Sequence, residues 1–151
     1  MAQTFLPRVT LLLLAGFALT TSDERKCNLS GTWLNDLGST MTIGNVDSNG
    51  VFRGSYLTAV ASTNTTIIES PLIGCQQKGS EPTFGMLIKW NFTESITSFT
   101  GQCFVDEDGK ERLETMWLLR RHAPKKEDNW AATRVGTNYF IRSPSPEDLH
   151  E

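Results

Sequence analysis

The chain has 151 residues, with 14 basic and 17 acidic side chains and a formal net charge of −3 at pH 7. This length suits one domain with one hydrophobic core. The acidic balance argues against nucleic acid as a partner, because nucleic acid attracts clustered Lys and Arg. The one basic cluster, at residues 120–126, is followed by Glu127 and Asp128, and we interpret it as a solvated loop.

The first 22 residues have the pattern of a secretory signal peptide. Arg8 supplies a positive charge, a short apolar run extends from Val9 to Leu19, and small residues suited to cleavage follow. The run is about half of the roughly 20 residues that a membrane span needs, and no other segment approaches that length. We therefore predict a signal peptide at 1–22 and a secreted, extracellular protein that does not bind membranes.

The rest of the chain has the pattern of an all-β protein. β-branched and aromatic residues occur in short runs between turn residues, without a sustained helical period. The runs predict strands at residues 29–34, 39–46, 51–57, 65–70, 84–92, 98–105, 111–121 and 130–142. Short turns between neighbours favour an eight-stranded antiparallel up-and-down β-barrel over residues 24–143, which leaves no exposed edges. The proline-broken, polar residues 144–151 are predicted to be a disordered tail.

Three cysteines in a secreted chain imply one disulfide and one remaining thiol. We expect Cys27 to be bridged to Cys103, which would join the first strand to a late one and stabilise the fold by ~4 kcal/mol in the chain-entropy model. A bridge that starts at the first strand favours the barrel over an immunoglobulin-type sandwich. Cys75 follows a turn-like sequence at 71–74 and is expected at the surface. It could be buried and inert, a free thiol, or bridged to another subunit.

The sequence offers little support for catalysis. His122 and His150 have no partner pattern for metal binding or general base chemistry. Residues 106–109 lack the ligand series of a calcium loop and are interpreted as a hairpin turn. Nucleophile elbows, phosphate-binding loops and Cys-x-x-Cys pairs do not occur. We predict that the protein is not an enzyme and uses neither a metal nor a cofactor.

Aromatic and small neutral polar residues instead indicate a binding pocket. Tyr56 and Thr58 share one face of a predicted strand, and Trp90 and Phe92 share a face of another. Rigid aromatic walls with uncharged donors suit a small, mostly apolar ligand that has a neutral polar head. Each residue alone is more simply read as core or turn, so the prediction depends on their joint order.

That joint order resembles the avidin family, the secreted biotin-binding proteins, over nearly all of the chain after the signal. The segments with the family's order and spacing are residues 33–39, 56–60, 90–95, 99–103, 115–119 and 130–138. A lipocalin-type carrier of another apolar ligand is the alternative, because Gly31 and Trp33 satisfy that class's weak Gly-x-Trp pattern. The later segments do not follow it.

The resemblance implies high-affinity binding of biotin without turnover, and sequestration of this vitamin in host defence. The residues implied at the ureido group, ring and walls are Asn35, Leu37, Ser39, Tyr56, Thr58, Val60, Trp90, Phe92, Thr97, Phe99, Trp117, Leu119 and Asn138. Those implied at the carboxylate are Ala61, Ser62, Thr63, Thr93 and Ser95. Ala61 stands where a hydroxyl residue is common, which predicts weaker binding than in the tightest members.

The resemblance also implies a homotetramer built as a dimer of dimers. Trp130 would leave its own barrel and cap the pocket of a neighbouring subunit, while Met116, Val135 and Thr137 would lie near a subunit contact. Three Asn-x-Ser/Thr sequons suit a secreted glycoprotein. The candidate glycosylation sites are Asn28, Asn64 and Asn91.

Overall fold

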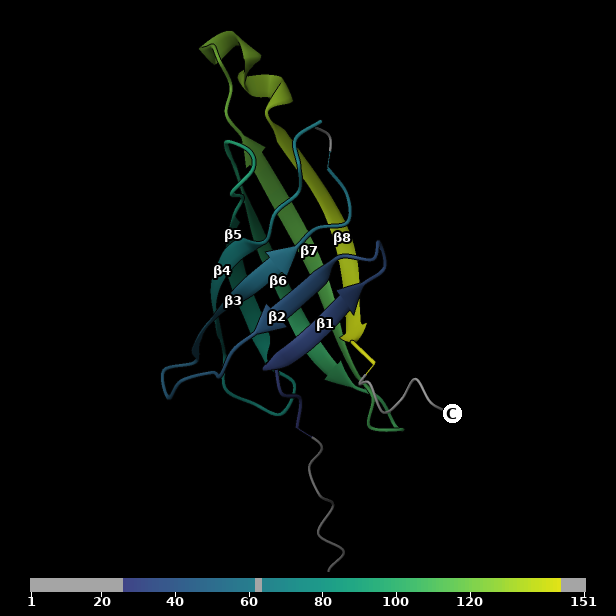
Figure 1. Cartoon of the computed structure of the whole chain (residues 1–151). Coiled ribbons are helices and arrows are strands. Elements are labelled where there is room, and N and C mark those ends of the chain that lie inside the picture. Colours follow the sequence, from purple (N-terminus) through teal and green to yellow (C-terminus); the bar gives the residue numbers. More distant parts are fainter. Residues whose placement is uncertain (1–25, 62–63, 145–151) are drawn as a thin grey trace, which may run out of the picture.

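The structure, a computed structural model, describes residues 26–61 and 64–144 (Figure 1). The predicted signal peptide and residues 145–151 of the predicted tail lie outside the described residues. Within the described ranges the chain forms eight strands and one short 3₁₀ helix. The elements are β1 (Gly31–Asn35), β2 (Thr40–Ile43), β3 (Val51–Leu57), β4 (Ser70–Gln76), β5 (Thr83–Lys89), β6 (Ser95–Val105), β7 (Glu111–Arg121), η1 (Lys126–Ala131) and β8 (Thr133–Arg142).

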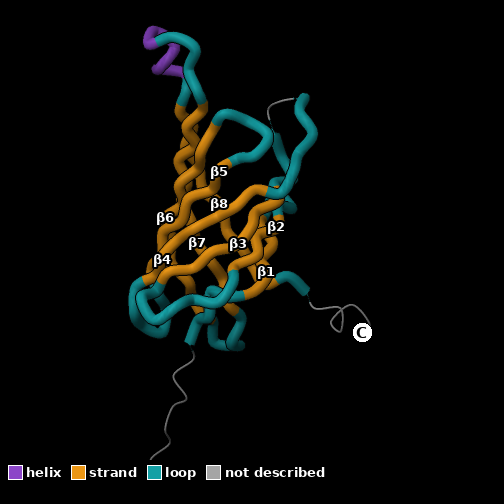
Figure 2. Tube along the Cα trace, turned by 60° about the vertical axis from the view of Figure 1, so that its left-hand side comes forward, coloured by secondary structure: helices purple, strands orange, loops and turns teal. Residues whose placement is uncertain are grey.

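The strands close into a barrel. Each strand pairs antiparallel with the next, and β8 pairs with β1, so the predicted eight-stranded up-and-down barrel is confirmed. Closure pairs the backbone of every strand on both sides and leaves room inside for side chains or one small ligand. Figure 2 shows β6, β7 and β8 extending beyond the shorter strands at the end where η1 connects β7 to β8.

The fourth strand lies later in the sequence than we predicted. A strand was expected at 65–70 and a turn at 71–74, whereas β4 begins at Ser70 and runs through the expected turn. Pro71 is the residue that made this segment resemble a turn. It pairs only with β3, because the pairing of β4 with β5 begins at Leu72. Because Pro71 has no partner in β5, its missing N–H costs no hydrogen bond between β4 and β5.

The last strand begins later than predicted. The expected strand at 130–142 starts with Trp130, but this residue lies in η1, and β8 begins at Thr133. Backbone hydrogen bonds between residues three positions apart form this short helix, so Trp130 lies on a tight helical turn. The predictions at 51–57 and 111–121 match β3 and β7, and the remaining boundaries shift by a few residues.

A packed layer fills the barrel near the end of β8, away from η1. Trp33 and Phe140 are both 0% exposed there. The Trp33 Nε1–H donates to the carbonyl oxygen of Leu29 at 2.9 Å, and the Arg142 guanidinium covers the indole at 3.9 Å from the ring centroid. Side chains therefore fill this end of the barrel at the density of a protein core.

The cysteines behave largely as expected. A disulfide joins Cys27 to Cys103 of β6, which confirms the expected bridge between the start of the barrel and a late strand. Both residues are buried. Cys75 is a free, exposed cysteine, so its expected surface position is confirmed and the buried alternative is wrong. It lies within β4 and not after a turn.

Among the described residues, no helix is both long and apolar enough to cross a membrane.

Candidate functional site

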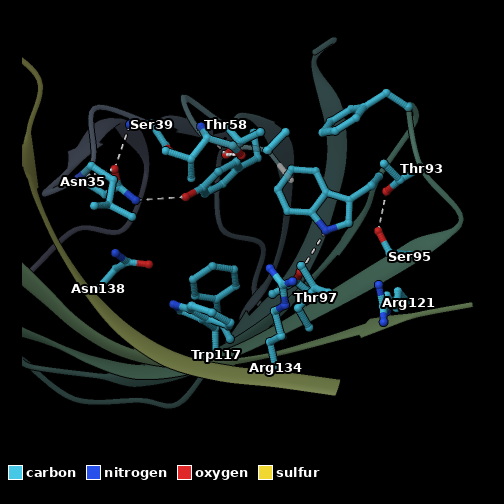
Figure 3. Close-up of a pocket in the computed structure, with 18 of the residues that line it drawn as sticks. Asn35, Ser39, Thr58, Thr93, Ser95, Thr97, Trp117, Arg121, Arg134 and Asn138 are labelled. Carbon is cyan, nitrogen blue, oxygen red and sulfur yellow. Dashed lines mark hydrogen bonds between the residues drawn. The ribbon is translucent and has the colours of Figure 1, made fainter. Parts of the chain in front are cut away.

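A cavity of about 440 Å³ lies inside the barrel (Figure 3). Small-molecule pockets typically measure about 300–1,000 Å³. The lining residues that the sequence predicts are Asn35, Leu37, Ser39, Tyr56, Thr58, Val60, Ala61, Trp90, Phe92, Thr93, Ser95, Thr97, Phe99, Trp117, Leu119 and Asn138. Ser62 and Thr63 lie outside the described residues. The lining residues that the sequence reasoning missed are Glu94, Arg121 and Arg134.

Asn35 ends β1 and organises the turn to β2. Its Oδ1 accepts the backbone N–H groups of Leu37 at 3.0 Å and Ser39 at 2.7 Å. Gly38 permits this tight return because it adopts a φ of +82°, which side-chain-bearing residues rarely do. The turn leaves the Asn35 Nδ2 group on the pocket side, where it donates to the Tyr56 hydroxyl oxygen at 3.2 Å.

Ser39 and Tyr56 place two hydroxyl groups beside the Asn35 amide. The Ser39 Oγ accepts the backbone N–H of Ala59 at 3.0 Å, so its hydroxyl hydrogen is the group that can donate. Burial raises the pKa of the Tyr56 phenol to about 12, opposed by a hydrogen bond with Ser39 and assisted by the negative charge of Asp36. Tyr56 is therefore a neutral donor at physiological pH.

Two hydrogen-bond acceptors complete this inner end of the pocket. The Asn138 Nδ2 donates to Asp36 Oδ1 at 2.7 Å, and Figure 3 shows the Asn138 amide oxygen on the side of the pocket. The Thr58 Oγ1 donates to the Val60 carbonyl oxygen at 2.8 Å and accepts the Val60 backbone N–H at 3.2 Å, which leaves one hydroxyl lone pair available. Three donors and two acceptors, all neutral, therefore meet at the inner end.

Aromatic rings form the walls above these polar groups. Tyr56 and Trp90 meet edge to face with centroids 5.6 Å apart, and Trp90 and Phe92 meet at 5.7 Å. The Trp90 Nε1–H donates to the Thr97 Oγ1 at 2.8 Å, which fixes the indole and leaves the hydroxyl hydrogen of Thr97 for another partner. Such edge-to-face contacts hold the rings rigid and apolar toward the cavity.

Trp117 needs a glycine on the neighbouring strand. Gly136 of β8 is its cross-strand partner, and a Cβ atom at this glycine would lie 2.4 Å from Trp117 Cζ2. Atoms without a bond between them cannot approach so closely, so any larger residue would displace the indole. The absence of a side chain on Gly136 therefore sets the position of this wall.

The mouth of the pocket is hydroxylic and charged. The hydroxyl groups of Thr93 and Ser95 hydrogen-bond to each other. Arg121 and Arg134 line the same region, and both are exposed. The same strand alternation that identified the walls could have found them, because Arg121 lies four residues after Trp117 and Arg134 four before Asn138. Both are charged, whereas the residues predicted to line the pocket are all uncharged.

Trp130 does not line the cavity of its own chain. Its side chain is 85% exposed, in η1 beyond the end of the barrel. The outer surface of the neighbouring strands is also apolar: Met116 is 64% and Val135 70% exposed. Val135 is paired with Leu118, and Met116 with Thr137, so these side chains form one patch over β7 and β8. Contiguous exposed apolar area is uncommon on the surface of monomeric proteins.

Throughout the described part of the chain, no group of three or more His, Cys, Asp or Glu residues is placed to hold a metal ion. The inner end carries neutral hydrogen-bonding groups held by other protein groups, and the walls are rings in fixed contact. Together they suit recognition of a small ligand with a neutral polar head. The fold and site thus define a ligand-binding β-barrel protein.

Comparisons with known proteins identify which barrel this is. The Avidin family model matches residues 23–143. Avidin of Gallus gallus is 55% identical over 137 residues, which cover 87% of this chain and 90% of that protein. The crystal structure of Xenavidin is 53% identical with a TM-score of 0.77, over 78% of this chain and 99% of that chain. The X-ray structure of a biotin binding protein from chicken is 55% identical with a TM-score of 0.77, over 80% and 99% of the two chains.

The chain belongs to the avidin family. This is a non-catalytic family, which confirms the prediction that the protein is not an enzyme. Membership over most of the chain also removes support for the lipocalin-type alternative, which depended on one short pattern near the first strand.

Proposed function

We propose that this protein binds biotin in the barrel cavity and releases it unchanged. The observation that carries the proposal is the arrangement at the inner end. A urea group offers one carbonyl oxygen between two N–H groups. Asn35, Ser39 and Tyr56 would donate to that oxygen, while Thr58 and Asn138 would accept from the two N–H groups. Converging donors polarise the urea toward a negative oxygen, which strengthens each bond.

The remaining lining residues fit the rest of biotin. Thr97 would lie near the ring sulfur. The apolar residues that would enclose the rings and the valerate methylenes are Leu37, Val60, Trp90, Phe92, Phe99, Trp117 and Leu119. The residues proposed at the carboxylate are Ala61, Ser62, Thr63, Thr93 and Ser95. Ala61 cannot donate from its side chain, and a missing hydrogen bond costs about 1–3 kcal/mol. We therefore propose weaker binding than in the tightest family members.

The proposed assembly is a homotetramer, built as a dimer of dimers, in which Trp130 covers the pocket of a neighbouring subunit. Two observations support it: Trp130 is 85% exposed outside its own cavity, and the patch that contains Met116 and Val135 leaves large apolar side chains in contact with solvent. Covering such surfaces is favourable at about 25 cal/mol per Å² of apolar area.

The proposed setting is extracellular. The apolar segment at 1–22 and the disulfide between Cys27 and Cys103 support secretion, because disulfides persist in oxidising compartments. Asn28, Asn64 and Asn91 are all exposed, as glycosylation requires. Sequestration of biotin in host defence would follow from binding without turnover. We propose neither nucleic acid nor membrane as a partner.

Titration with biotin, followed by tryptophan fluorescence, tests the function directly. The expected result is stoichiometric quenching at one biotin per chain, together with a raised melting temperature, because a ligand that binds only the folded state stabilises it. If micromolar biotin caused neither quenching nor a rise in melting temperature, the proposal would be refuted. Sedimentation of the biotin-bound protein as a monomer would refute the tetramer without refuting binding.

A further inference from the structure

The two ends of the cavity differ in the sign of the charged side chains near them. Asp36 lies at the inner end, where it holds the amide of Asn138. Arg121 and Arg134 line the mouth. Glu94 is the one carboxylate among the described residues that line the cavity, and its Oε2 lies 3.0 Å from the His122 Nδ1. The mouth therefore has two guanidinium groups and one carboxylate that already has a partner.

Strand register places the two arginines at successive levels of the pocket. Thr97, Leu119 and Arg134 are paired across β6, β7 and β8 in one rung. Ser95 and Arg121 form the next rung outward. Two residues along a strand advance by about 6.8 Å, so the backbone of Arg134 lies roughly 14 Å from that of Asn138. The cations follow the direction in which a ligand held at Asn138 would extend.

The guanidinium groups keep donors available toward the mouth. Arg121 Nη2 donates to the carbonyl oxygen of Ala131 at 3.0 Å, which uses one of its five N–H groups. The Arg134 side chain forms no hydrogen bond or ion pair with the described residues. Figure 3 shows Arg134 on the side of Thr97 and Arg121 on the side of Ser95. The hydroxyls of Thr93 and Ser95 add neutral donors beside them.

We propose that Arg121 and Arg134 recognise the carboxylate of the bound ligand and select its free acid over neutral derivatives of the same ring system. This inference rests on the proposed binding of biotin and adds a selectivity that neutral hydroxyl groups alone would not give. A guanidinium group binds a carboxylate through charge-assisted hydrogen bonds, whereas an uncharged amide or ester in the same place gains little from the charge. The two arginines offset only part of the hydrogen bond that Ala61 cannot donate.

The test compares biotin with biotinamide, its neutral primary amide, on the full-length protein. The variants are Arg134→Gln and the double change Arg121→Gln/Arg134→Gln, which remove charge and keep polarity. Arg53→Gln on exposed β3 is the matched control. Arg134→Gln is needed as a single change, because Arg121 also contacts η1 through Ala131.

The double variant is expected to lose affinity for biotin by roughly tenfold, since exposed ion pairs contribute modestly and two are removed. Its affinity for biotinamide should stay within about twofold of the unchanged protein, and Arg53→Gln should leave both affinities unchanged. Added salt should weaken biotin binding only where the arginines are present. Equal loss for both ligands, or no loss for either, would overturn the carboxylate role. Failure of the unchanged protein to bind either ligand would refute the biotin proposal itself.

Discussion

The inner end of the pocket and its mouth differ in how firmly the protein holds their polar groups. At the inner end, Asn35, Ser39 and Asn138 each form a hydrogen bond of 3.0 Å or less to a second protein group. At the mouth, Arg121 and Arg134 are exposed and have few protein partners. Groups fixed before the ligand arrives lose little entropy on binding. The inner end should therefore contribute most affinity, and the mouth should adjust selectivity.

The largest effect expected from this contrast comes from Asn35→Ala. The change removes a proposed ligand donor together with the turn that positions Ser39, so binding of biotin should weaken by roughly 100-fold, or about 3 kcal/mol. Dissociation kinetics would measure it. Asp47→Ala is the matched control, because Asp47 Oδ1 also accepts two backbone N–H groups, those of Asn49 at 2.8 Å and Val51 at 2.9 Å, in a turn remote from the pocket. Equal losses of biotin affinity in Asn35→Ala and Asp47→Ala would contradict the expectation that the inner end contributes most of the affinity.

Trp130→Ala should have the next largest effect. If this exposed indole covers a neighbouring pocket, its loss should weaken binding by roughly 30-fold, as for a buried aromatic anchor at an interface, and should lower the stability of the tetramer. Dissociation kinetics and sedimentation velocity would measure the two effects. Trp130→Phe should retain much of both. Unchanged binding in Trp130→Ala would show that the pocket is complete within one chain.

Gly136→Ala tests the wall between the two ends. The new Cβ would lie 2.4 Å from Trp117 and displace the indole, which should weaken binding by roughly tenfold, since overpacking costs about 1–3 kcal/mol. Gly85→Ala is the control, because its Cβ would meet nothing closer than 3.6 Å. A crystal structure or a shift in tryptophan emission would report the displaced ring. Normal binding by Gly136→Ala would show that the Trp117 indole can move with little loss of binding free energy.

The smallest effect is expected on raising the pH. The pKa of Tyr56 is raised to about 12, so its phenol remains a donor and biotin binding should stay constant from pH 7 to about pH 10, where an ordinary tyrosine is half ionised. Because the raised pKa belongs to the folded state, the stability linked to neutral Tyr56 is present below pH 10 and is lost as pH rises toward 12. Dissociation rates across this range would measure it. A loss of biotin affinity with a midpoint near pH 10 would contradict the interpretation of Tyr56 as a buried, neutral donor.

Much of the fold could be predicted because its signals are local. Alternating apolar residues and short turns indicated the number of strands and the closed barrel, and β3 and β7 were bounded correctly. β4 was misplaced because Pro71 has the local chemistry of a turn, and only its pairing with one neighbour makes it acceptable in a strand. Trp130 was assigned to a strand because aromatic residues favour strands, although the backbone there forms a helix.

The candidate site was predictable where linked segments follow the family pattern, and it was incomplete where charge mattered. Arg121 and Arg134 were missed because only uncharged residues were expected in the pocket, although each shares a strand face with Trp117 or Asn138. The role of Asp36 was also missed. It does not line the cavity, and it acts by holding an amide on a distant strand.

The sequence by itself determined the strand alternation, the expected disulfide and the kinds of residues available for a neutral pocket, because these depend on residue type and short spacing. Tertiary structure alone decided which polar atoms remain available to a ligand. Asp36 and Asn138 are 102 residues apart and meet only when β8 closes the barrel against β1. Closure sets the register, and the register sets which side chains form the inner end and which form the mouth.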